Sequence, residues 1–233
     1  MAELLYEGKA KQVYKTEKED EYLIHYKDDA TAGNGVKHDK FEGKGVLNNT
    51  ISCIIFDMLE EAGIKTHMIK KLNERDILVK KVDIFPLEVI VRNITTGSFC
   101  RRLGAPEGIV LDEPIFELSY KNDDYGDPLI NEDHAVALKL CTREEYNFIK
   151  QETLKINELL KEFFLSLNLK LVDFKIEFGK TPDGQILLAD EISPDSCRLW
   201  DVETNQKYDK DVFRQDIGDL IETYKAVLAR MQK

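Results

Sequence analysis

The sequence predicts an α+β protein built from two lobes, a β-rich N-terminal lobe over residues 1–85 and a mixed α/β C-terminal lobe over residues 86–233. Three observations support this prediction. Short runs of β-type composition fill much of the first lobe, three segments repeat apolar residues at helical spacing, and a hairpin pattern follows the second of these segments. A chain of 233 residues is long enough to enclose a sizeable core. We expect the ligand site in the cleft between the lobes, where binding sites commonly lie.

The N-terminal lobe is predicted to contain strands, a turn and one helix. Strand-like runs at 12–16 and 21–26 lead into turn residues at 28–35. A helix is expected next, and Gly63 is a natural C-terminal stop for it. Its apolar face consists of residues at helical spacing, namely Leu47, Ile51, Ile54, Ile55, Met58, Leu59 and Ala62. A β-rich stretch at 76–85 completes the lobe.

The C-terminal lobe is predicted to open with a strand at 87–94. Thr142 followed by Glu145 forms a capping box, which predicts that a helix begins there. The apolar line of that helix is Ile149, Ile156, Leu160, Phe163 and Leu167. A hairpin over 171–191 comes next, and an amphipathic helix over 213–231 closes the chain.

Composition and charge narrow the range of functions. With a net charge of −11, the chain would repel a polyphosphate backbone, so we do not expect it to bind nucleic acid. Its apolar runs are only a few residues long, and its N-terminal stretch lacks the pattern of an export signal, so we expect no membrane association. The cysteines are far apart and form no CxxC pair, which is typical of a cytoplasmic protein without a disulfide framework or a zinc site. They are Cys53, Cys100, Cys141 and Cys197.

Although the net charge is negative, the chain contains local clusters of basic residues. Lys9 and Lys11 form one cluster, and Arg92, Arg101 and Arg102 form another. A small anionic ligand held by a few cations is compatible with this charge balance.

The hairpin over 171–191 contains more acids than a packed or neutral sheet would require. Between residues 172 and 178, apolar and charged residues alternate, which places Asp173, Lys175 and Glu177 on one face. The turn is predicted at Asp183-Gly184, a strong hairpin signal.

The length of that turn decides which side chains meet across the two strands. A two-residue loop puts Glu177 directly opposite Asp190, and a four-residue loop keeps both acids on one face, whereas a three-residue loop does not. Facing carboxylates repel each other unless a cation neutralises them, and Lys175 could screen only part of the charge. Mg²⁺ is usually bound by one or two carboxylates together with substrate phosphates, so we expect Glu177 and Asp190 to hold Mg²⁺. The alternative is a solvated polar face of the sheet.

Two further stretches have the composition of phosphate-binding segments. Gly8, Lys9, Ala10 and Lys11 lie between apolar segments, where a glycine lets the backbone approach a ligand and the lysines can meet phosphate oxygens. No Walker A or GxGxxG pattern occurs in the chain, and a solvated turn is the alternative interpretation of this segment.

The second stretch follows the strand at 87–94. Arg92, with the small residues and hydroxyl groups that lead to Ser98, suits a phosphomonoester, and the alternative is a capped helix start with surface arginines. Residues 120–134 have the composition of a surface loop. The segment 193–201, after the second hairpin strand, contributes Asp195 and Arg198.

Together these segments resemble the SAICAR synthetase family (phosphoribosylaminoimidazole-succinocarboxamide synthase) of purine biosynthesis. The likeness extends along essentially the whole chain, and its most specific blocks are PLEVIVR at 86–92 and LVDFKIEFG at 171–179. It also includes YEGKAKQVY, DATAGNG, GKGVLNN, TGSFCRRLG, KNDDYGDP, LLADEISPDSCRLWD and DKDVFRQ. The resemblance implies a SAICAR synthase-like fold related to the nucleotide-binding lobes of protein kinases and ATP-grasp enzymes, with ATP bound between the lobes.

The resemblance also implies an activity and a set of site residues. ATP, CAIR (5-amino-1-(5-phospho-D-ribosyl)imidazole-4-carboxylate) and L-aspartate would give SAICAR, ADP and phosphate, through an acyl phosphate. The ATP site would comprise Gly8, Lys9, Ala10 and Lys11 at the phosphates, Lys81 and Val82 at the adenine, and Glu177 and Asp190 on Mg²⁺. The ribonucleotide phosphate would be bound by Arg92, Ser98 and Arg198. The reacting centre would be lined by Lys121, Asp127, Asp173, Lys175 and Asp195.

Within that centre, Lys11 and Lys175 would offset charge on the transferred phosphoryl group, and either Asp127 or Asp173 would take the proton of the attacking amine. Asn34 stands where some members of the family have an aspartate. A cytoplasmic homo-oligomer, with a dimer favoured, would follow from the resemblance. Two other functions remain compatible with the residues, a small-molecule kinase of related fold and a non-catalytic nucleotide sensor.

Overall fold

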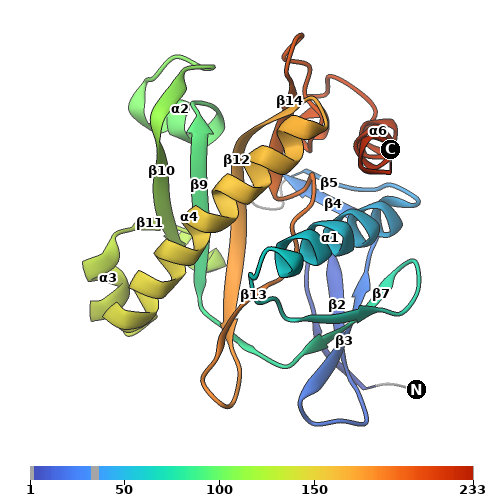
Figure 1. Ribbon diagram of the computed structural model, residues 1–233, viewed down its shortest axis with the longest axis vertical. Coiled ribbons are helices and arrows are strands. Elements are labelled where there is room, and N and C mark those ends of the chain that lie inside the picture. The colour runs from blue at the N-terminus through green and yellow to red at the C-terminus, as the bar shows by residue number, and fades with distance from the viewer. Residues whose placement is uncertain (1–2, 33–36, 233) are drawn as a thin grey trace.

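Figure 1 shows the computed structural model of the chain, which describes residues 3–32 and 37–232. Two antiparallel sheets organise the fold. The first has five strands, which in spatial order are β1 (Leu4–Glu7), β2 (Lys11–Lys15), β3 (Glu21–Tyr26), β7 (Asp76–Lys80) and β6 (Met68–Lys71).

The second sheet has seven strands and is built around one long strand, β12 (Leu169–Lys180). Its spatial order is β11 (Leu129–Ile130), β10 (Val110–Tyr120), β9 (Leu87–Ile94), β12 and β13 (Ile186–Ala189). Two more strands also pair with β12, β8 (Asp83–Ile84) and β14 (Cys197–Asp201). The chain therefore passes from the first sheet to the second between Lys80 and Asp83.

The helices cover the two sheets and join them. In Figure 1, α1 (Lys44–Glu61) lies over the first sheet and α4 (Arg143–Ser166) crosses β9 and β12 of the second. The shorter helices are α2 (Gly97–Leu103), η1 (Asp123–Tyr125), α3 (Glu132–Ala137), α5 (Asp211–Arg214) and α6 (Leu220–Met231). The last of these, α6, packs against α1, so the end of the chain returns to the N-terminal half.

Both long helices occur where the periodicity predicted them. Leu47, Ile51, Ile55 and Leu59 of α1 are buried, and the chain turns out of the helix at Gly63, whose φ of 89° suits glycine. The capping box of α4 is also confirmed. The Thr142 side chain accepts a hydrogen bond from the Glu145 N–H at 3.1 Å, and the Glu145 carboxylate accepts one from the Thr142 N–H at 2.8 Å.

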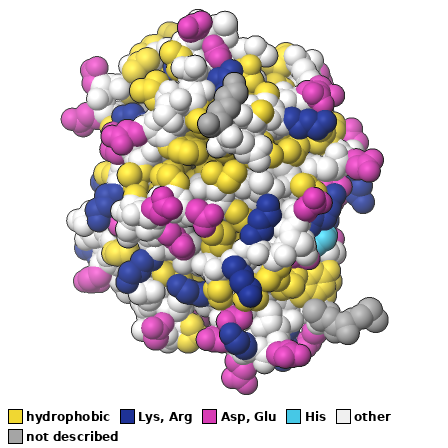
Figure 2. Space-filling view, turned by 45° about the vertical axis from the view of Figure 1, so that its right-hand side comes forward, with side chains coloured by type: hydrophobic (Ala, Val, Ile, Leu, Met, Phe, Trp, Pro, Cys, Tyr) yellow, Lys and Arg dark blue, Asp and Glu magenta, His cyan; other side chains and the backbone are white. Residues whose placement is uncertain are grey.

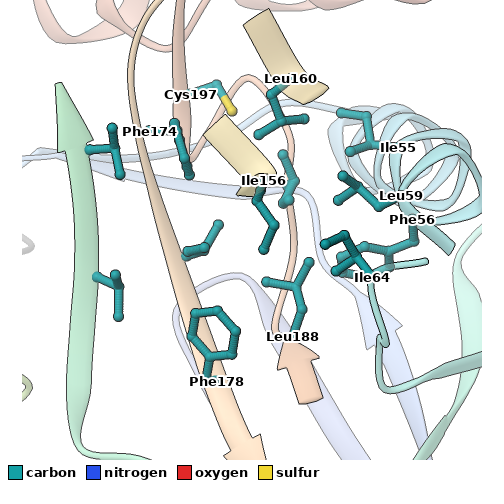
Figure 3. Packing of buried hydrophobic residues seen from close by; sticks show 14 of the residues in the cluster. Ile55, Phe56, Leu59, Ile64, Ile156, Leu160, Phe174, Phe178, Leu188 and Cys197 are labelled. Atoms are coloured by element: carbon teal, nitrogen blue, oxygen red, sulfur yellow. The ribbon is translucent and has the colours of Figure 1, made fainter. Parts of the chain in front are cut away.

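One hydrophobic cluster joins the two sheets. Figure 3 shows side chains of α1, including Phe56, directed toward Leu188 of β13 and the aromatic side chains of β12. Ile156 and Leu160 of α4 lie between the side chains of β12 and those of α1 in the same cluster. Because the sheets share this core, their relative position is fixed by apolar packing as well as by the connecting chain.

Several short elements, among them β6, β11, α3 and β14, were not predicted, and the structure also differs from the prediction in three longer segments. The predicted turn at 28–35 includes β4 (Asp29–Ala32), which pairs with β5 (Lys37–Lys40). β10 was not predicted because it has no clean alternation and contains a proline, which lies at an irregularity in the pairing with β9. The predicted tail helix over 213–231 is two helices, because the chain adopts a φ of 54° at Asp216 and leaves helical geometry between α5 and α6.

On the face shown in Figure 2, basic side chains are interspersed with the acidic ones. Among the described residues, no helix is both long enough and apolar enough to cross a membrane.

Candidate active site

The central strand β12 places its charged side chains on one face and its apolar side chains in the core, as predicted. Phe174 and Ile176 are each 1% exposed, whereas Asp173, Lys175 and Glu177 point to the other face. Asp173 and Glu177 are also buried, each with 4% exposure. The alternative interpretation, a solvated outer face, is therefore wrong at these two positions.

The predicted register of the hairpin is wrong. Glu177 pairs with Ala189 and Lys180 with Ile186, and the turn lies between Thr181 and Gln185, whose backbones are joined by a 2.9 Å hydrogen bond. The loop thus has three residues, the length for which the two acids should not share a face.

The acids converge nevertheless, because the backbone changes direction at Asp190. This residue follows the last residue of β13 and has a left-handed φ of 62°, which releases its side chain from the alternation of the strand. The charge of Asp190 is close enough to Glu177 to contribute to raising the pKa of that carboxyl. The two acids thus interact electrostatically, but Glu177 pairs across the strands with Ala189 and not with Asp190 as predicted.

Three lysines from different elements surround the two carboxylates. Lys11 of β2 contacts Asp190 and lies 3.3 Å from Glu191. Lys121 donates to Glu177 at 2.6 Å, and the Lys175 ammonium lies 3.7 Å from the same carboxylate. The charge of the buried acids is thus offset by cations from both sheets and from the segment after β10.

The pKa shifts reflect this arrangement of charges. Burial, followed by repulsion from Asp190, raises the pKa of Glu177, and Lys175 and Lys121 oppose that shift. Burial would also raise the pKa of Asp190, but the charges of Lys11 and Lys175 lower it to about 2. Burial disfavours the charged form of Lys11, yet Asp190 and Glu191 raise its pKa well above the usual value. A site that keeps several charges in a buried space is suited to a highly charged ligand.

The carboxylate pair has the donor chemistry that Mg²⁺ requires. Glu177 and Asp190 supply hard oxygen ligands on converging side chains. Within residues 3–32 and 37–232, no group of three or more His, Cys, Asp or Glu side chains is arranged as a metal cage. A divalent cation here would therefore take its remaining ligands from phosphate oxygens and water, which is the usual arrangement for Mg²⁺ with a nucleotide.

The glycine hairpin lies beside the acid pair. The Gly8 N–H donates to the Lys11 carbonyl at 2.8 Å and closes the turn that leads to Lys11. Between these residues, Ala10 accepts a backbone hydrogen bond from Lys27 at 2.8 Å, and the exposed Lys9 forms a 3.1 Å ion pair with Asp123. This ion pair joins the hairpin to the segment that contains Lys121.

The segment that connects the two sheets also lies close to the acid pair. Val82 packs against Gly179 of β12, where an added Cβ would lie 2.4 Å from the Val82 side chain. The backbone N–H of Lys81 donates to Asp20 at 2.7 Å, and the Lys81 ammonium lies 5.8 Å from the centre of the Tyr22 ring. Val82, one of the two residues predicted to contact adenine, therefore lies beside a residue of β12 that is two positions from Glu177.

A pocket of about 170 Å³ lies on the same face of β12, and the predicted phosphate-binding residues line it. Arg92 donates to Ser98 at 3.0 Å and to Asp173 at 3.0 Å. Arg198 donates to Asp173 at 2.9 Å. Lys175 and Arg214 also line this pocket. Two guanidinium groups held by one carboxylate form a rigid cationic wall, which suits a phosphate group.

Several residues that orient these arginines were not predicted from the sequence. Glu117 accepts from Arg92 at 2.7 Å and from Arg102 at 2.8 Å. Asp211 accepts from Arg198 at 2.9 Å and from Arg214 at 2.7 Å. Glu117 lies on β10, a strand that was not predicted. The signal for Asp211 and Arg214 was the DKDVFRQ segment, which entered only through the resemblance.

Two of the predicted reacting-centre residues, Asp195 and Asp173, have carboxylates that are already bound by other side chains of the protein. Asp195 lines the pocket, and its buried carboxylate is bound by Lys44 at 2.6 Å, by Lys210 at 3.3 Å and by the Tyr224 hydroxyl. Asp173 lies between two arginines, as described above. Asp127 is half-buried and accepts one hydrogen bond, from the Asn122 N–H at 2.8 Å. Asn34 lies outside the described residues.

The comparisons with known proteins point to one family over nearly the whole chain. A family model described as SAICAR synthetase matches residues 4–231. A protein of Finegoldia magna named phosphoribosylaminoimidazole-succinocarboxamide synthase is 69% identical over 230 residues, which make up 99% of this chain and 99% of that protein. A protein of the same name from Caldanaerobacter subterraneus is 59% identical over 231 residues, 99% of this chain and 98% of that protein.

Solved structures confirm the predicted α+β fold. The crystal structure of phosphoribosylaminoimidazole-succinocarboxamide synthase from Ehrlichia chaffeensis is 44% identical with a TM-score of 0.96, and the match covers 99% of this chain and 98% of that one. A SAICAR synthetase in complex with ADP is 50% identical with a TM-score of 0.94, and the match covers 97% of this chain and 96% of that one.

Proposed function

The chain belongs to the SAICAR synthetase family, and we propose that its buried carboxylate pair and its arginine pocket are the two halves of one active site. The protein is an ATP-dependent ligase of purine biosynthesis, which joins L-aspartate to the carboxylate of CAIR and yields SAICAR, ADP and phosphate. The observation that carries the proposal is the position of Lys175. It lines the arginine pocket and lies 3.7 Å from Glu177, so it belongs to both halves.

The reaction has two steps. A carboxylate is a poor acyl donor, because an oxide would have to leave. Transfer of the γ-phosphoryl group of ATP to the CAIR carboxylate gives an acyl phosphate and ADP. The α-amine of aspartate then attacks the acyl carbon, phosphate leaves, and the amine loses a proton. The protein contributes mainly by positioning the reactants and by offsetting charge.

The first half of the site would bind the nucleotide. Backbone groups at Gly8 and Ala10 would approach the phosphates closely, with Lys9 and Lys11 offsetting their charge. Glu177 and Asp190 would hold Mg²⁺, which when bound neutralises charge on the ATP phosphates. On arrival of the cation, the Lys121 ammonium would be free to leave Glu177 and meet an anionic substrate. Residues Lys81 and Val82 would contact the adenine.

The second half would bind the ribonucleotide. Arg92, Ser98 and Arg198 would bind the CAIR phosphate, because all three side chains are hydrogen-bond donors and all three residues line the same pocket. Asp173 holds both guanidinium groups in place, and Asp195, which also lines the pocket, is bound by Lys210. Lys175 would lie between the two bound substrates and offset charge on the transferred phosphoryl group.

We assign the removal of the amine proton to Asp127 in preference to Asp173. Both oxygens of Asp173 accept hydrogen bonds from Arg198, and one of them also accepts from Arg92. A carboxylate whose two oxygens are already hydrogen-bonded to arginines is better suited to position those arginines than to accept a proton. The Asp127 carboxylate accepts a single hydrogen bond, so one of its oxygens can still accept a proton. Its segment is partly exposed and is joined to Glu177 through Lys121.

We further propose that the protein works as a homodimer in the cytoplasm. Both expectations derive from the family likeness, and light scattering on the purified protein tests the first.

Measuring ADP release with each substrate omitted in turn tests the reaction. The ligase should release ADP at its full rate only when ATP, CAIR and L-aspartate are all present. A small-molecule kinase would release ADP at full rate without aspartate, and a nucleotide sensor would release none. Either result would exclude the ligase.

A further inference from the structure

Tyr26 is a buried tyrosine at the end of β3 to which neither half of the proposed active site assigns a role. It is 1% exposed and belongs to the hydrophobic cluster that joins the two sheets. Its hydroxyl is also buried and has no hydrogen-bond partner among the described residues. The interactions of this side chain within the described structure are therefore made by its ring.

The backbone of Tyr26 is held firmly by its neighbours. Its N–H donates to the Arg75 carbonyl at 2.9 Å, and its own carbonyl accepts from the Arg75 guanidinium at 3.2 Å. Gly45 of α1 packs so closely that an added Cβ would lie 2.5 Å from the Tyr26 carbonyl oxygen. Because these contacts fix the backbone and the core encloses the side chain, the ring is a rigid surface.

The Lys11 ammonium lies over the face of this ring. Lys11 of β2 and Tyr26 of β3 are paired across the two strands, and the Lys11 Nζ atom is 5.3 Å from the centre of the ring. A cation at this distance is attracted by the electrons of an aromatic face, and the attraction is strongest where water is excluded. The same ammonium contacts Asp190 and lies 3.3 Å from Glu191. Lys11 is thus attracted by two carboxylates and by one aromatic ring.

The carboxylates and the ring differ in how they respond to a bound nucleotide. In the proposed function Asp190 would also hold Mg²⁺, and a carboxylate that is shared with a second cation attracts the Lys11 ammonium less strongly. The ammonium would then direct N–H groups to phosphate oxygens. The Tyr26 ring is enclosed by the core, so its attraction for the ammonium does not change.

We propose that Tyr26 is a positioning residue, whose ring keeps the Lys11 ammonium at the nucleotide phosphates when the neighbouring carboxylates are engaged by another cation. This inference rests on the proposed role of Lys11 in offsetting phosphate charge. The alternative is that Tyr26 only fills space in the core.

Substitutions at Tyr26 separate these two roles. Tyr26→Phe removes only the hydroxyl, and Tyr26→Leu removes the ring. Phenylalanines with one, two or three fluorine atoms at position 26 keep the ring in place but weaken the negative potential of its face. Ile77→Ala is the control for packing, because Ile77 is fully buried in the same cluster and lies on β7, which β3 separates from β2. For each protein, kinetics give kcat/KM for ATP and calorimetry gives the Kd of CAIR.

We expect Tyr26→Leu to lower kcat/KM for ATP by about 10-fold, the size of a cation–π contact from which water is excluded. Tyr26→Phe should retain most of the activity, since the hydroxyl has no partner, and each added fluorine should lower kcat/KM further. Ile77→Ala should lower Tm without lowering kcat/KM for ATP. The Kd of CAIR should stay at the parental value in every variant, because CAIR would bind in the separate arginine pocket.

A fluorine series with constant kcat/KM would overturn the inference, because the ring would then act only by its shape. This series also decides the question if Tyr26→Leu does not fold. A double-substitution cycle with Lys11→Met gives an independent result. Tyr26→Leu should have no further effect once Lys11 is replaced, whereas an equal loss in both backgrounds would show that Tyr26 acts through packing.

Proton NMR gives a readout that does not depend on turnover. The ring current of Tyr26 should move the Lys11 Hε signals upfield of those of exposed lysines, and this shift should persist when ADP and Mg²⁺ bind. Loss of the shift in the bound protein would show that the ammonium leaves the ring, which contradicts the inference.

Lys11→Met by itself tests the premise. If this variant keeps the parental kcat/KM for ATP, the proposed role of Lys11 at the phosphates is wrong. If it loses activity while the fluorine series is constant, only the role of Tyr26 is wrong.

Discussion

At the scale of single residues, the acids of this protein differ by what neutralises them. Glu177 and Asp190 are paired with lysines, Asp173 with arginines, and Asp209 with backbone N–H groups only. Asp209 is fully buried and accepts from the Leu199 N–H at 2.9 Å and the Asp211 N–H at 2.7 Å. Burial, with a contribution from the charge of Asp211, raises the pKa of Asp209 to about 7.

This shift predicts a pH dependence of stability. The Asp209 carboxyl binds its proton more tightly in the folded state, so its stabilising contribution is complete below about pH 4 and is lost as the pH rises toward 7. Relative to Asp209→Asn, the free energy of unfolding of the parent should fall by about 2 kcal/mol between pH 5 and pH 7. Urea unfolding of both proteins at several pH values measures this difference. Parallel curves for the two proteins would contradict the assigned shift.

Gly97 lies directly against the Arg198 guanidinium and leaves no room there for a side chain. It has a φ of 57°, and an added Cβ would lie 2.7 Å from the Arg198 guanidinium. Gly97→Ala should therefore displace Arg198 and lower kcat/KM for CAIR by about 10- to 100-fold, with little change in ATP affinity. Gly104→Ala is the matched control, because Gly104 has a φ of 67° and no atom within 4 Å of an added Cβ. If both variants lose activity equally, backbone strain and not Arg198 is the cause.

At the scale of elements, the sequence predicted those with a strong local signal. α1 and α4 follow from apolar spacing and a capping box, and β9 follows from a mainly apolar run before Arg92. β10 and the break before α6 were missed because tertiary contacts decide them. β10 pairs with β9 and β11, which come before and after it in the chain, and Asp216 adopts a left-handed φ of 54° just after α5 ends at Arg214.

The capping box of α4 gives a direct test at this scale. Thr142→Ala should lower the free energy of unfolding by about 1 kcal/mol and Tm by about 2–4 °C, because a backbone N–H at the helix start loses its acceptor. Thr142→Ser should retain most of the stability. Turnover should be the same in both variants, because Thr142 and Glu145 form hydrogen bonds with each other and with Lys180, and not with Glu177 or Arg198. Equal losses of Tm for the two variants would show that the hydroxyl is not the stabilising group.

The candidate site itself was predicted in its residue types more accurately than in its geometry. Alternation along β12 correctly grouped Asp173, Lys175 and Glu177. The position of Asp190 could not be derived, because it depends on a three-residue loop and one left-handed backbone conformation, neither of which has a strict sequence signature. Glu117 contributes through side-chain contacts between separate elements, and no local pattern reveals these.

At the scale of the whole molecule, the two sheets are joined close to the site. The shared core fixes their packing, and Lys44 of α1 reaches Asp195 after β13, where Tyr224 of α6 also binds. These contacts connect the beginning, middle and end of the chain around the arginine pocket. A ligand that must meet Lys11 of the first sheet and Arg198 of the second therefore encounters cations whose relative positions are already set.

If the carboxylates of Glu177 on β12 and Asp190 after β13 hold the metal–nucleotide complex, Glu177→Gln should abolish most of the turnover. The measurement is kcat/KM for ATP at saturating Mg²⁺, with Glu222→Gln as the control, because Glu222 is an exposed helix residue paired only with Lys225. We expect Glu177→Gln to lose at least about 100-fold while its unfolding transition stays cooperative, and Glu222→Gln to match the parent. A Glu177→Gln variant that turns over at the parental rate would show that Glu177 does not hold the metal–nucleotide complex.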